Sequence, residues 1–382
     1  MRILHLCLAN FYIDGYNYQE NVLTRINKED GHDVRIIAST ETFADNVTTT
    51  YVEPSEYVTE FGVPIKRIPY VKIGTHFSTI KIRKYVGLYD EIVKFAPDVI
   101  LCHDIVFWSI FDVIRYKKEH PEVKLYADTH TGIYNSGRNW LSLHLLHRCF
   151  YRYLIHRTLP YLEKYFYITV GERDFSIQHY GIPEEMLEFF PLGGNLPTEA
   201  EYQERRAARR AELGLAPDEL LLVHSGKVNN LKRTDELLKA FAAVPEMKAK
   251  LVIIGSITDD VKPELETLME ADPRVVYLGW KSASDLLEYL CACDLYCQPG
   301  SLSATLQNAV CCGSPIMSYP HPAYTGELDY NNILWVETQE DMEQVFRKLA
   351  AGQADLNELR ENSWRCAREV LDYRKIAARI YR

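Results

Sequence analysis

The sequence predicts an α/β protein made of two doubly wound halves, each a parallel sheet with helices on both faces. Three observations support this prediction: the chain length, the recurrence of short apolar runs, and one charged, turn-rich break near the middle. At 382 residues the chain exceeds one usual domain, so we expect two. Hydrophobic residues make up 47% of the chain and charged residues 25%, which excludes a disordered or coiled-coil protein.

Short apolar runs recur through the first half, with helical stretches between them. Continuous apolar runs are typical of parallel strands that are buried on both faces of a sheet. The same rhythm begins again after residue 219. We expect strands at 3–8, 34–40, 98–104, 123–130 and 165–170 in the first half, and at 220–227, 250–256, 274–280, 294–300 and 315–320 in the second.

The break between the halves lies at residues 191–219, where turn-forming residues precede a charged helical stretch. It predicts an N-terminal domain at residues 1–192 and a C-terminal domain at 193–362, with Gly193 and Gly194 as candidate hinge residues. Residues 363–382 have helical spacing and no strand after them. We expect them to form a C-terminal helix that docks on either half, a return to the first half being one option.

The net charge of −10 argues against a general nucleic-acid binder, because phosphate binding needs a basic face. The nine cysteines are odd in number and scattered through apolar runs without matched CxxC pairs, which predicts core thiols rather than disulfides or a zinc site. No apolar run approaches the roughly 18 residues of a membrane span, and no signal peptide is evident. We therefore expect a cytoplasmic protein.

Ligands of open α/β sheets bind beyond the carboxyl ends of the strands, so function is expected there. In the first half, Gly15 lies in the loop after the first run, without the G-x-G-x-x-G spacing of dinucleotide sites. The third run ends at His103 and Asp104, and the fourth ends at Asp128 and His130. A lone histidine is more often structural than catalytic, so spacing alone makes His130 no more than a candidate.

In the second half, Gly226 ends a predicted strand, Lys227 is adjacent, and Lys232 lies near the start of the next helix. Lysines at these positions can neutralise a diphosphate, while backbone amides at a helix N-terminus donate to its oxygens. Surface lysines are common, so two of them are weak evidence by themselves.

The stretch CQPGSLSATLQNAVCCGSP, residues 297–315, predicts a turn and N-cap followed by a helix of small residues. The amides of Leu302, Ser303 and Ala304 would suit phosphate oxygens, and Asn308 or its neighbour Gln307 could bind a ribose hydroxyl. A capped helix that packs only for stability is an equal alternative.

Taken together, these segments resemble the retaining glycosyltransferases of the GT-B fold, in the group 1 superfamily. The resemblance extends over nearly the whole chain, from DGYNYQENVLTRINKEDGHDV through SGKVNNLKRTDELLKAF to NAVCCGSPI, in the order typical of the family. It implies two facing Rossmann-like domains, with Gly15 in the loop facing the donor phosphates and His130 as the catalytic residue beside the transferred sugar. It also implies that Lys227 and Lys232 hold the diphosphate and that Trp280 flanks the nucleobase.

One feature departs from the family. Its members usually carry two glutamates eight positions apart, the first touching the donor sugar and the second the ribose. Aligned back from Cys312-Gly313-Ser314-Pro315, these positions hold Gly300 and Asn308. An amide can still bind a diol, so Asn308 can preserve nucleotide binding. Gly300 cannot replace a carboxylate, so Ser301, Ser303 or another loop would contact the sugar, or activity would be reduced or absent.

The resemblance implies transfer from a nucleotide-diphosphate sugar, expected to be UDP-linked, to a glycan or lipid-linked acceptor in cell-surface polysaccharide biosynthesis. Lysines and amides would stabilise the leaving diphosphate, so we expect neither a metal nor another cofactor. Two alternatives stay open. One is a non-catalytic pseudo-glycosyltransferase that binds a partner enzyme or a glycan, motivated by Gly300 and Asn308. The other is a GT-B nucleotide-sugar epimerase, which needs no acceptor.

Residues 138–164 form a basic and aromatic stretch with a single acid, Glu163. Such a stretch can lie against anionic lipid headgroups, which would place the protein peripherally on the inner face of the cell membrane. The alternative is an amphipathic helix packed on the first sheet with its arginines in solvent. In either case we expect the first half to supply the acceptor site, with Glu20 and Asp104 as candidates for holding a hydroxyl.

Overall fold

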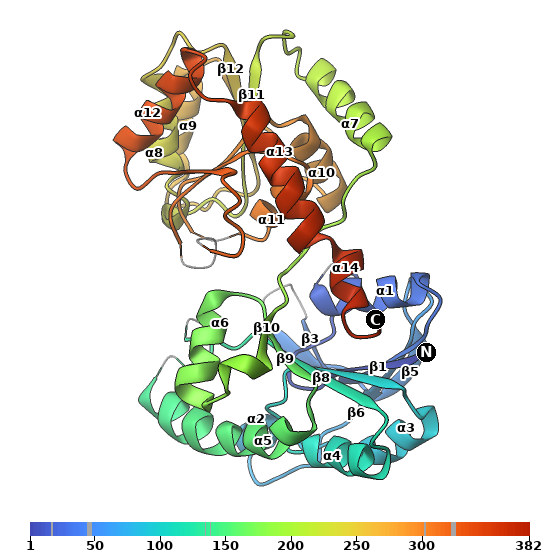
Figure 1. The fold of residues 1–382 in the computed structure, drawn as a ribbon. Helices are drawn as coiled ribbons and strands as arrows, with labels where there is room; N and C mark the ends of the chain where they lie inside the picture. Colours follow the sequence, from blue (N-terminus) through green and yellow to red (C-terminus); the bar gives the residue numbers. More distant parts are fainter. Residues whose placement is uncertain (17, 44–47, 134, 138, 302, 322–325) are drawn as a thin grey trace. The chain divides into compact units, whose positions relative to one another are not determined.

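The chain folds into two compact units in the computed structural model, which describes all residues except 17, 44–47, 134, 138, 302 and 322–325 (Figure 1). Unit 1 comprises Met1–Pro191 with Tyr373–Arg382, and unit 2 comprises Leu192–Asp372. Each unit is built on one large sheet with mostly parallel strands. The predicted fold class, two doubly wound α/β halves, is confirmed.

Unit 1 contains an eight-stranded sheet in the order β10-β9-β8-β7-β1-β2-β6-β5. The edge strand β5 runs antiparallel to β6, and the other neighbouring strands are parallel. The strands are β1 (Arg2–Cys7), β2 (Asp33–Ser39), β5 (Ser55–Val58), β6 (Pro64–Ile68), β7 (Val99–His103), β8 (Lys124–Thr129), β9 (Lys164–Tyr167) and β10 (Leu187–Phe189); β3 (Glu41–Phe43) and β4 (Thr49–Tyr51) form a separate pair.

Successive side chains of β1 point to opposite faces of this sheet, as the period of a strand requires. Leu4 and Leu6 join a core with α3, α4 and α5, whereas Ile3 joins a second core with α1 and α14. His5 therefore faces α1, because it lies two positions from Ile3 and so on the same face of the strand.

The helices of unit 1 are α1 (Gln19–Glu29), α2 (His76–Ile82), α3 (Leu88–Phe95), α4 (Ile110–Glu119), η1 (Ser142–Tyr151), α5 (Arg152–Thr158), α6 (Val170–Phe175), η3 (Ser176–Tyr180) and α14 (Tyr373–Ala378).

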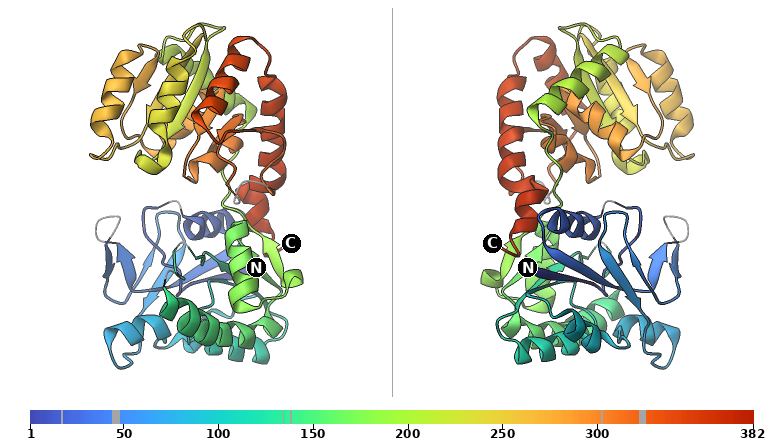
Figure 2. Two further views of the ribbon diagram at one scale, coloured as in Figure 1. Left: turned by 90° about the vertical axis from the view of Figure 1, so that its left-hand side faces the viewer. Right: turned by 90° about the vertical axis from the view of Figure 1, so that its right-hand side faces the viewer.

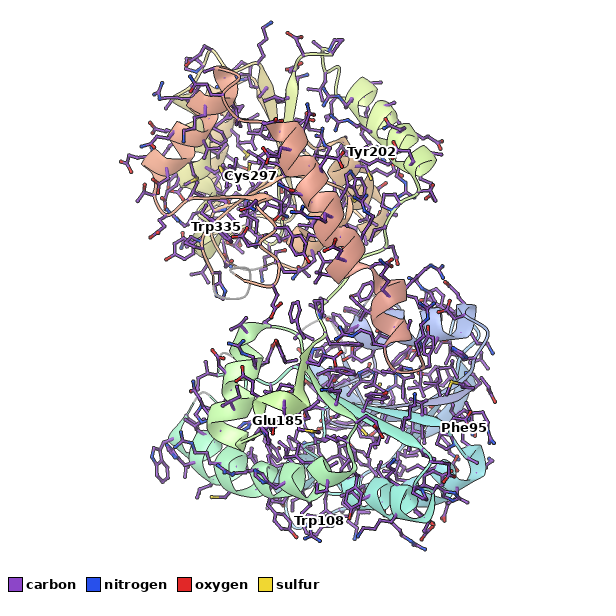
Figure 3. All side chains as sticks on the ribbon, in the orientation of Figure 1. Phe95, Trp108, Glu185, Tyr202, Cys297 and Trp335 are labelled. Carbon is purple, nitrogen blue, oxygen red and sulfur yellow. The ribbon has the colours of Figure 1, made fainter. Side chains whose placement is uncertain are left out.

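Unit 2 contains a six-stranded parallel sheet in the order β13-β12-β11-β14-β15-β16. Helices α8, α9 and α12 cover the face that holds Cys297, which lies inside the unit in Figure 3. The strands are β11 (Leu220–Ser225), β12 (Ala249–Ile254), β13 (Val275–Tyr277), β14 (Leu295–Gln298), β15 (Ile316–Ser318) and β16 (Ile333–Trp335). The helices are α7 (Glu199–Glu212), α8 (Thr234–Ala242), α9 (Lys262–Ala271), α10 (Ala283–Ala292), α11 (Thr305–Cys311), α12 (Gln339–Ala350) and α13 (Leu356–Cys366), with a short 3-10 turn, η5 (Asn230–Lys232).

All ten predicted strands are present within a few residues of the expected bounds. The strands that the sequence did not predict are β3, β4, β5, β6, β10 and β16, which are three to five residues long. Most of them lie at or near sheet edges, where burial is incomplete and the apolar run that marks a strand is short.

The C-terminal segment 363–382 is not one helix, and this differs from the expectation. Helix α13 passes into a π-helical turn, η6 (Ala367–Leu371), and the chain becomes extended at Asp372 with ψ 108° before α14 begins. The carbonyl of Leu371 accepts a hydrogen bond from the Gly194 amide at 2.8 Å. The Gly194 amide thus takes the place of the backbone amide that a continuing helix would supply. Helix α14 then packs beside α1 in unit 1 (Figures 1 and 2).

Gly194 has a packing role in unit 2. A Cβ at this position would stand 2.7 Å from the Cys311 Sγ atom, which is closer than a side chain tolerates. The absence of a side chain therefore lets the chain pass α11 at the boundary between the units. A hinge at Gly193 and Gly194 stays a prediction.

All nine cysteines are free thiols, and all except Cys149 are buried. The prediction that they pack in the core is confirmed for these eight. Among the described residues, no helix combines the length and the apolar character needed to cross a membrane.

Candidate active site

His130 follows β8 in unit 1 and lies beside two carboxylates. Its Nε2 atom is 3.8 Å from Oε1 of Glu20 and 3.8 Å from Oδ1 of Asp128. Both distances are too long for a hydrogen bond, and Nε2 has no partner among the residues that the structure describes. Glu20 lies in the first turn of α1 and accepts a hydrogen bond from the Asn10 side chain. The fold thus brings His130 and Glu20 together, although 110 positions separate them in the sequence.

A buried chain of hydrogen bonds leads from Asp128 to α1. Oδ2 of Asp128 is 2.6 Å from Nδ1 of His103, Nε2 of His103 is 3.0 Å from Nδ1 of His5, and Nε2 of His5 is 2.8 Å from Oδ1 of Asn27. All four side chains are completely buried. Strands β8, β7 and β1 are neighbours in the sheet. His103 is opposite Asp128, and His5 is opposite Leu101, two positions from His103 and on the same face, which places the three residues in a row.

The electrostatics of this chain assign its protons. Burial, together with the nearby His103, lowers the pKa of His5 to about 3, so His5 is neutral at pH 7. Burial alone would lower the pKa of His103, but the adjacent Asp128 carboxylate raises it above its usual value. Burial opposes ionisation of Asp128, yet His103 lowers the pKa of this carboxyl. Asp128 therefore presents a negative charge to His130.

Asp104 directly follows β7 and has a left-handed conformation, with φ 62°. Its carboxylate accepts hydrogen bonds from the Thr131 hydroxyl at 2.8 Å and from the Ile105 amide at 2.7 Å. Burial nevertheless raises the pKa of Asp104. Left-handed backbone costs a non-glycine residue about 1–3 kcal/mol and is retained where the surroundings hold it in place.

A pocket of about 200 Å³ in unit 1 brings two of the predicted residues together. It is lined by His130, Asp104, Thr131, Asn10, Lys81 and Arg83, among others. Glu20 contacts this pocket through Asn10 and His130. Gly15 lies in an exposed turn of the loop between β1 and α1, with φ 76° and open space where a Cβ would stand. Backbone conformation, and not crowding, accounts for glycine there.

Lys232 is the central residue of the candidate site in unit 2. It is 5% exposed, and its ammonium donates to the Ser301 carbonyl at 3.1 Å. Burial lowers the pKa of Lys232 to about 8. Its Nζ atom is 3.4 Å from the point where a Cβ of Gly226 would stand, and Ser303 Oγ is 4.0 Å from the same point. The structure thus brings Gly226, Lys232 and Ser303 together at the carboxyl end of β11.

Gly300 has no room for a side chain. A Cβ at this position would overlap the Leu231 carbonyl oxygen and stand 2.6 Å from the backbone carbon of Lys232. The amide of the next residue, Ser301, donates to that same Leu231 carbonyl at 2.7 Å. The loop after β14 therefore packs in direct contact with the η5 backbone. A glutamate could not occupy position 300 without displacing Lys232.

The other predicted donor residues are more dispersed. Ser303 precedes α11, and its hydroxyl accepts from the Thr305 amide at 3.3 Å, but the N-cap position itself is Ala304, whose side chain cannot cap the helix. Asn308 is half-buried, and its Oδ1 points toward Gly194, 3.2 Å from the position of a Cβ there. Ala304 is exposed, and Leu302 lies outside the described residues.

Lys227 and Trp280 are exposed at the rim of unit 2. Lys227 follows Gly226, and Trp280 follows β13 with 75% of its surface exposed. The carbonyl before Trp280, that of Gly279, accepts from the Gly255 amide at 2.8 Å and anchors this loop to the end of β12. Contact of Lys227 with a diphosphate and of Trp280 with a base stay predictions.

Sequence reasoning missed His5, Asn27, Lys81 and Arg83. The one available signal was His5, a polar residue inside the apolar run ILHLCL. Such a position is buried, and a buried imidazole requires polar partners. The partners themselves depend on strand order, which the sequence does not state.

Comparison with known proteins gives the family of the second unit. Residues 205–364 match the family model described as "Glycosyl transferases group 1". D-inositol 3-phosphate glycosyltransferase from Rhodococcus jostii is 28% identical over 164 residues, which cover 39% of this chain and 36% of that protein. Alpha-galactosylglucosyldiacylglycerol synthase from Streptococcus pneumoniae is 26% identical over 202 residues, 50% of this chain and 52% of that protein. The matches thus span about half or less of the length of these curated relatives.

Solved structures match the whole chain. Alr3699/HepE from Anabaena, crystallised in complex with UDP, has a TM-score of 0.65 at 16% identity, covering 100% of this chain and 98% of that one. A glycosyltransferase from Rickettsia africae has a TM-score of 0.66 at 10% identity, covering 98% and 95%. At these identities the likeness shows the fold, which is GT-B. Residues 205–364 thus match the group 1 glycosyltransferase family, and the chain as a whole has the GT-B fold.

Proposed function

We propose that this protein transfers a sugar, with retention at the anomeric carbon, from a UDP-linked donor to a glycan or lipid-linked acceptor in cell-surface polysaccharide biosynthesis. The observation that carries the proposal is the buried Lys232 ammonium above Gly226 at the end of β11. A diphosphate bound there restores the electrostatic stabilisation that burial removes from this cation. The UDP complex of the similarly folded HepE supports the choice of nucleotide.

Lys227, Lys232 and the amides of Leu302, Ser303 and Ala304 would bind the diphosphate in this proposal. The bond between the anomeric carbon and the phosphate oxygen breaks, and negative charge grows on the leaving diphosphate. Preorganised cations and amides lower the barrier by stabilising that charge. The acceptor oxygen bonds to the anomeric carbon on the same face, and its proton passes to the leaving phosphate.

His130 and Gly15 would contact the donor from unit 1, His130 at the transferred sugar and Gly15 beside the phosphates. The buried Asp128 and Glu20 flank His130, so its ring lies beside two carboxylates at that contact. Asp104 and Glu20 would hold the acceptor hydroxyl.

The proposed chemistry needs no metal. Among the described residues, no group of three or more His, Cys, Asp or Glu side chains is arranged to hold a metal ion. Positive charge at the diphosphate would come from Lys227 and Lys232. Turnover in excess EDTA should equal turnover in added Mg²⁺ or Mn²⁺, and a loss of more than tenfold with EDTA would contradict this.

Calorimetric titration with UDP and GDP tests the donor site. Replacing Lys232 with Ala should weaken UDP binding by about 1.5–3 kcal/mol, the range for a hydrogen bond to a charged group. Lys248→Ala, which removes an exposed lysine paired with Asp218, is the matched control and should bind UDP normally. Equal affinity of the Lys232→Ala variant and the native protein would remove Lys232 from the site.

The same titration separates the alternatives. Absence of any nucleotide binding would favour a non-catalytic partner or glycan-binding protein. If a sugar donor binds, product analysis without an acceptor distinguishes an epimerase, which converts the donor, from a transferase, which does not. A screen of donors against extracted lipid-linked acceptors then identifies the transfer reaction.

We also propose that residues 138–164 contact anionic membranes. Helix α5 buries Leu154 and Ile155 against the unit 1 sheet, as the packing alternative requires. The start of this segment nevertheless exposes apolar side chains, with Trp140 66%, Leu141 61% and Leu145 55% exposed. The basic side chains that follow are Arg148, Arg152 and Arg157, all exposed, while Arg138 lies outside the described residues.

Sedimentation with vesicles containing anionic phospholipid tests this contact. Trp140→Ser combined with Leu141→Ser should reduce the bound fraction severalfold, because interfacial apolar side chains are lost while all basic ones remain. Trp280→Ser, which removes an equally exposed tryptophan from unit 2, is the control. Equal sedimentation of the double variant and the native protein would exclude this surface.

A further inference from the structure

Two cationic side chains line the same unit 1 pocket as His130 and Asp104. Lys81 lies in the last turn of α2, and Arg83 is the C-cap of that helix with φ 52°. Arg83 and Asp104 are both non-glycine residues with positive φ, and both face this pocket. Two strained positions at one pocket are typical of a functional site.

Neither cation forms an ion pair with a carboxylate of the described residues. In the described part of the chain, no ion pair within 4.0 Å involves Lys81 or Arg83, and the buried Nε of Arg83 has no hydrogen-bond partner. Lys81 contacts the Phe77 ring, with Nζ 5.8 Å from its centroid. Two half-buried cations without a counter-ion are costly in a folded protein.

The nearby carboxylates are already bound by other groups. Glu41 accepts a hydrogen bond from the Tyr70 hydroxyl at 2.7 Å and a longer one from Tyr51 at 3.4 Å. Asp104 accepts from Thr131 and from a backbone amide. Burial opposes the charge of Arg83, whereas Tyr151, Tyr85, Tyr70 and, to the smallest extent, Glu41 raise the pKa of this guanidinium. No ion pair within 4.0 Å joins Glu41 to Arg83 in the described part of the chain.

The two cations also influence each other. Burial lowers the pKa of Lys81, and the neighbouring Arg83 lowers it further. An anion between them would remove this repulsion and supply acceptors for both side chains. A guanidinium binds phosphate and carboxylate groups through paired hydrogen bonds, and a lysine adds a point charge.

We infer that this pocket binds the acceptor through an anionic group, phosphoryl or carboxylate, seated on Lys81 and Arg83 so that an acceptor hydroxyl lies at His130 and Asp104. The inference rests on the proposed transferase function and defines its acceptor class. The volume of about 200 Å³ is below the range of roughly 300–1,000 Å³ for drug-sized ligands. It suits one sugar or polyol ring with its charged substituent.

Binding of two simple anions tests the inference in the full chain. UDP is first added to saturation, to occupy the nucleotide site of unit 2, and inorganic phosphate or acetate is then titrated by calorimetry. The native protein should bind at least one of the two anions. Tighter binding of phosphate indicates a phosphorylated acceptor, and tighter binding of acetate indicates a carboxylated one.

Variants locate that anion. Lys81→Gln and Arg83→Asn should each weaken the binding about tenfold or more, and Arg83→Lys should retain most of it. Asn is chosen because it tolerates left-handed backbone. Lys84→Gln, at an exposed neighbouring lysine, is the matched control and should bind normally. If Arg83→Asn fails to fold, Lys81→Gln decides, because its side chain is only half-buried.

Two outcomes overturn the inference: no binding of either anion to the native protein, or equal binding by the native protein and both charge-removing variants. If UDP binds normally while the anion results contradict the inference, only the acceptor pocket in unit 1 is excluded, and the proposed donor site in unit 2 stands. If UDP does not bind at all, the proposed function fails separately. The anion titration is then repeated in the Lys232→Ala background, which leaves the unit 1 pocket as the site under test.

Discussion

Nε2 of His130 lies 3.8 Å from Oδ1 of Asp128, and the other oxygen of that carboxylate is 2.6 Å from Nδ1 of His103. The ionised Asp128 is therefore held by one histidine while it faces a second. Because His103 hydrogen-bonds to His5 on the next strand, the position of the carboxylate that faces His130 depends on a chain of residues that reaches α1.

His130→Ala should lower kcat by about 10²–10⁴-fold if the ring acts on the reacting sugar. The ring is partly exposed and its Nε2 makes no hydrogen bond among the described residues, so stability should change little. Steady-state kinetics and urea unfolding of the same preparation check both points. Unchanged kcat would end the catalytic assignment.

Asp128→Asn should destabilise unit 1 by about 1–3 kcal/mol, because it replaces the buried carboxylate that pairs with His103 and accepts from the Asp104 amide with a weaker acceptor. Asp98→Asn, at the amino end of β7, provides a comparison in the same unit. Urea unfolding at pH 7 measures the difference. Equal midpoints of the Asp128→Asn variant and the native protein would mean that the contact between Asp128 and His103 does not stabilise the folded chain.

The protein should lose stability as the pH falls from 6.5 to 5. His5 is neutral when folded, with a pKa of about 3, and takes up a proton near pH 6.5 when unfolded. The unfolded state therefore binds more protons in this window, so the free energy of unfolding decreases by up to about 1.4 kcal/mol per pH unit for this group. The contribution of His103, whose pKa is raised, is already complete below pH 6.5.

Unfolding in urea at pH 6.5, 6 and 5 measures this slope. Buried His224 and His147, with pKa values of about 4, act in the same direction. His5→Gln should therefore reduce the slope without abolishing it. An identical slope in the variant and the native protein would show that His5 does not contribute.

UDP affinity should fall as the pH rises above about 8. Lys232 is cationic below its lowered pKa and loses its proton above it, whereas a bound diphosphate would hold that proton. Calorimetry at pH 7 and pH 9, in buffers of different ionisation heat, should show weaker binding and proton uptake at the higher pH. Lys232→Ala should lose this proton uptake, and its persistence there would point to another group.

Gly300→Ala should disturb both stability and the donor site. Its methyl group would overlap the backbone at Leu231 and Lys232, so we expect a cost of about 1–3 kcal/mol and weaker UDP binding. Gly171→Ala is the control, because a Cβ there would meet its nearest atom at an ordinary 3.5 Å. Normal UDP affinity in Gly300→Ala would show that the loop adapts without moving Lys232.

Local sequence determined the elements and the donor loop. The apolar runs predicted ten strands because a strand buried on both faces must be apolar along its length. Gly226 and Lys232 were predictable as a pair because they share one loop after one strand, six positions apart. The helix after Ser303 was likewise visible from its small side chains, although its N-cap is Ala304 and not one of the predicted capping residues.

Tertiary structure decided everything that depends on strand order. The row from Asp128 through His103 to His5 exists because β8, β7 and β1 are adjacent, an order that differs from their order in the chain. The overlap that requires Gly300 arises from Leu231, 69 positions earlier, and Lys81 and Arg83 reach His130 only through the shared pocket. A sequence pattern indicates that a residue will be buried or will require a hydrogen-bond partner. Only the folded chain determines which other residue is that partner.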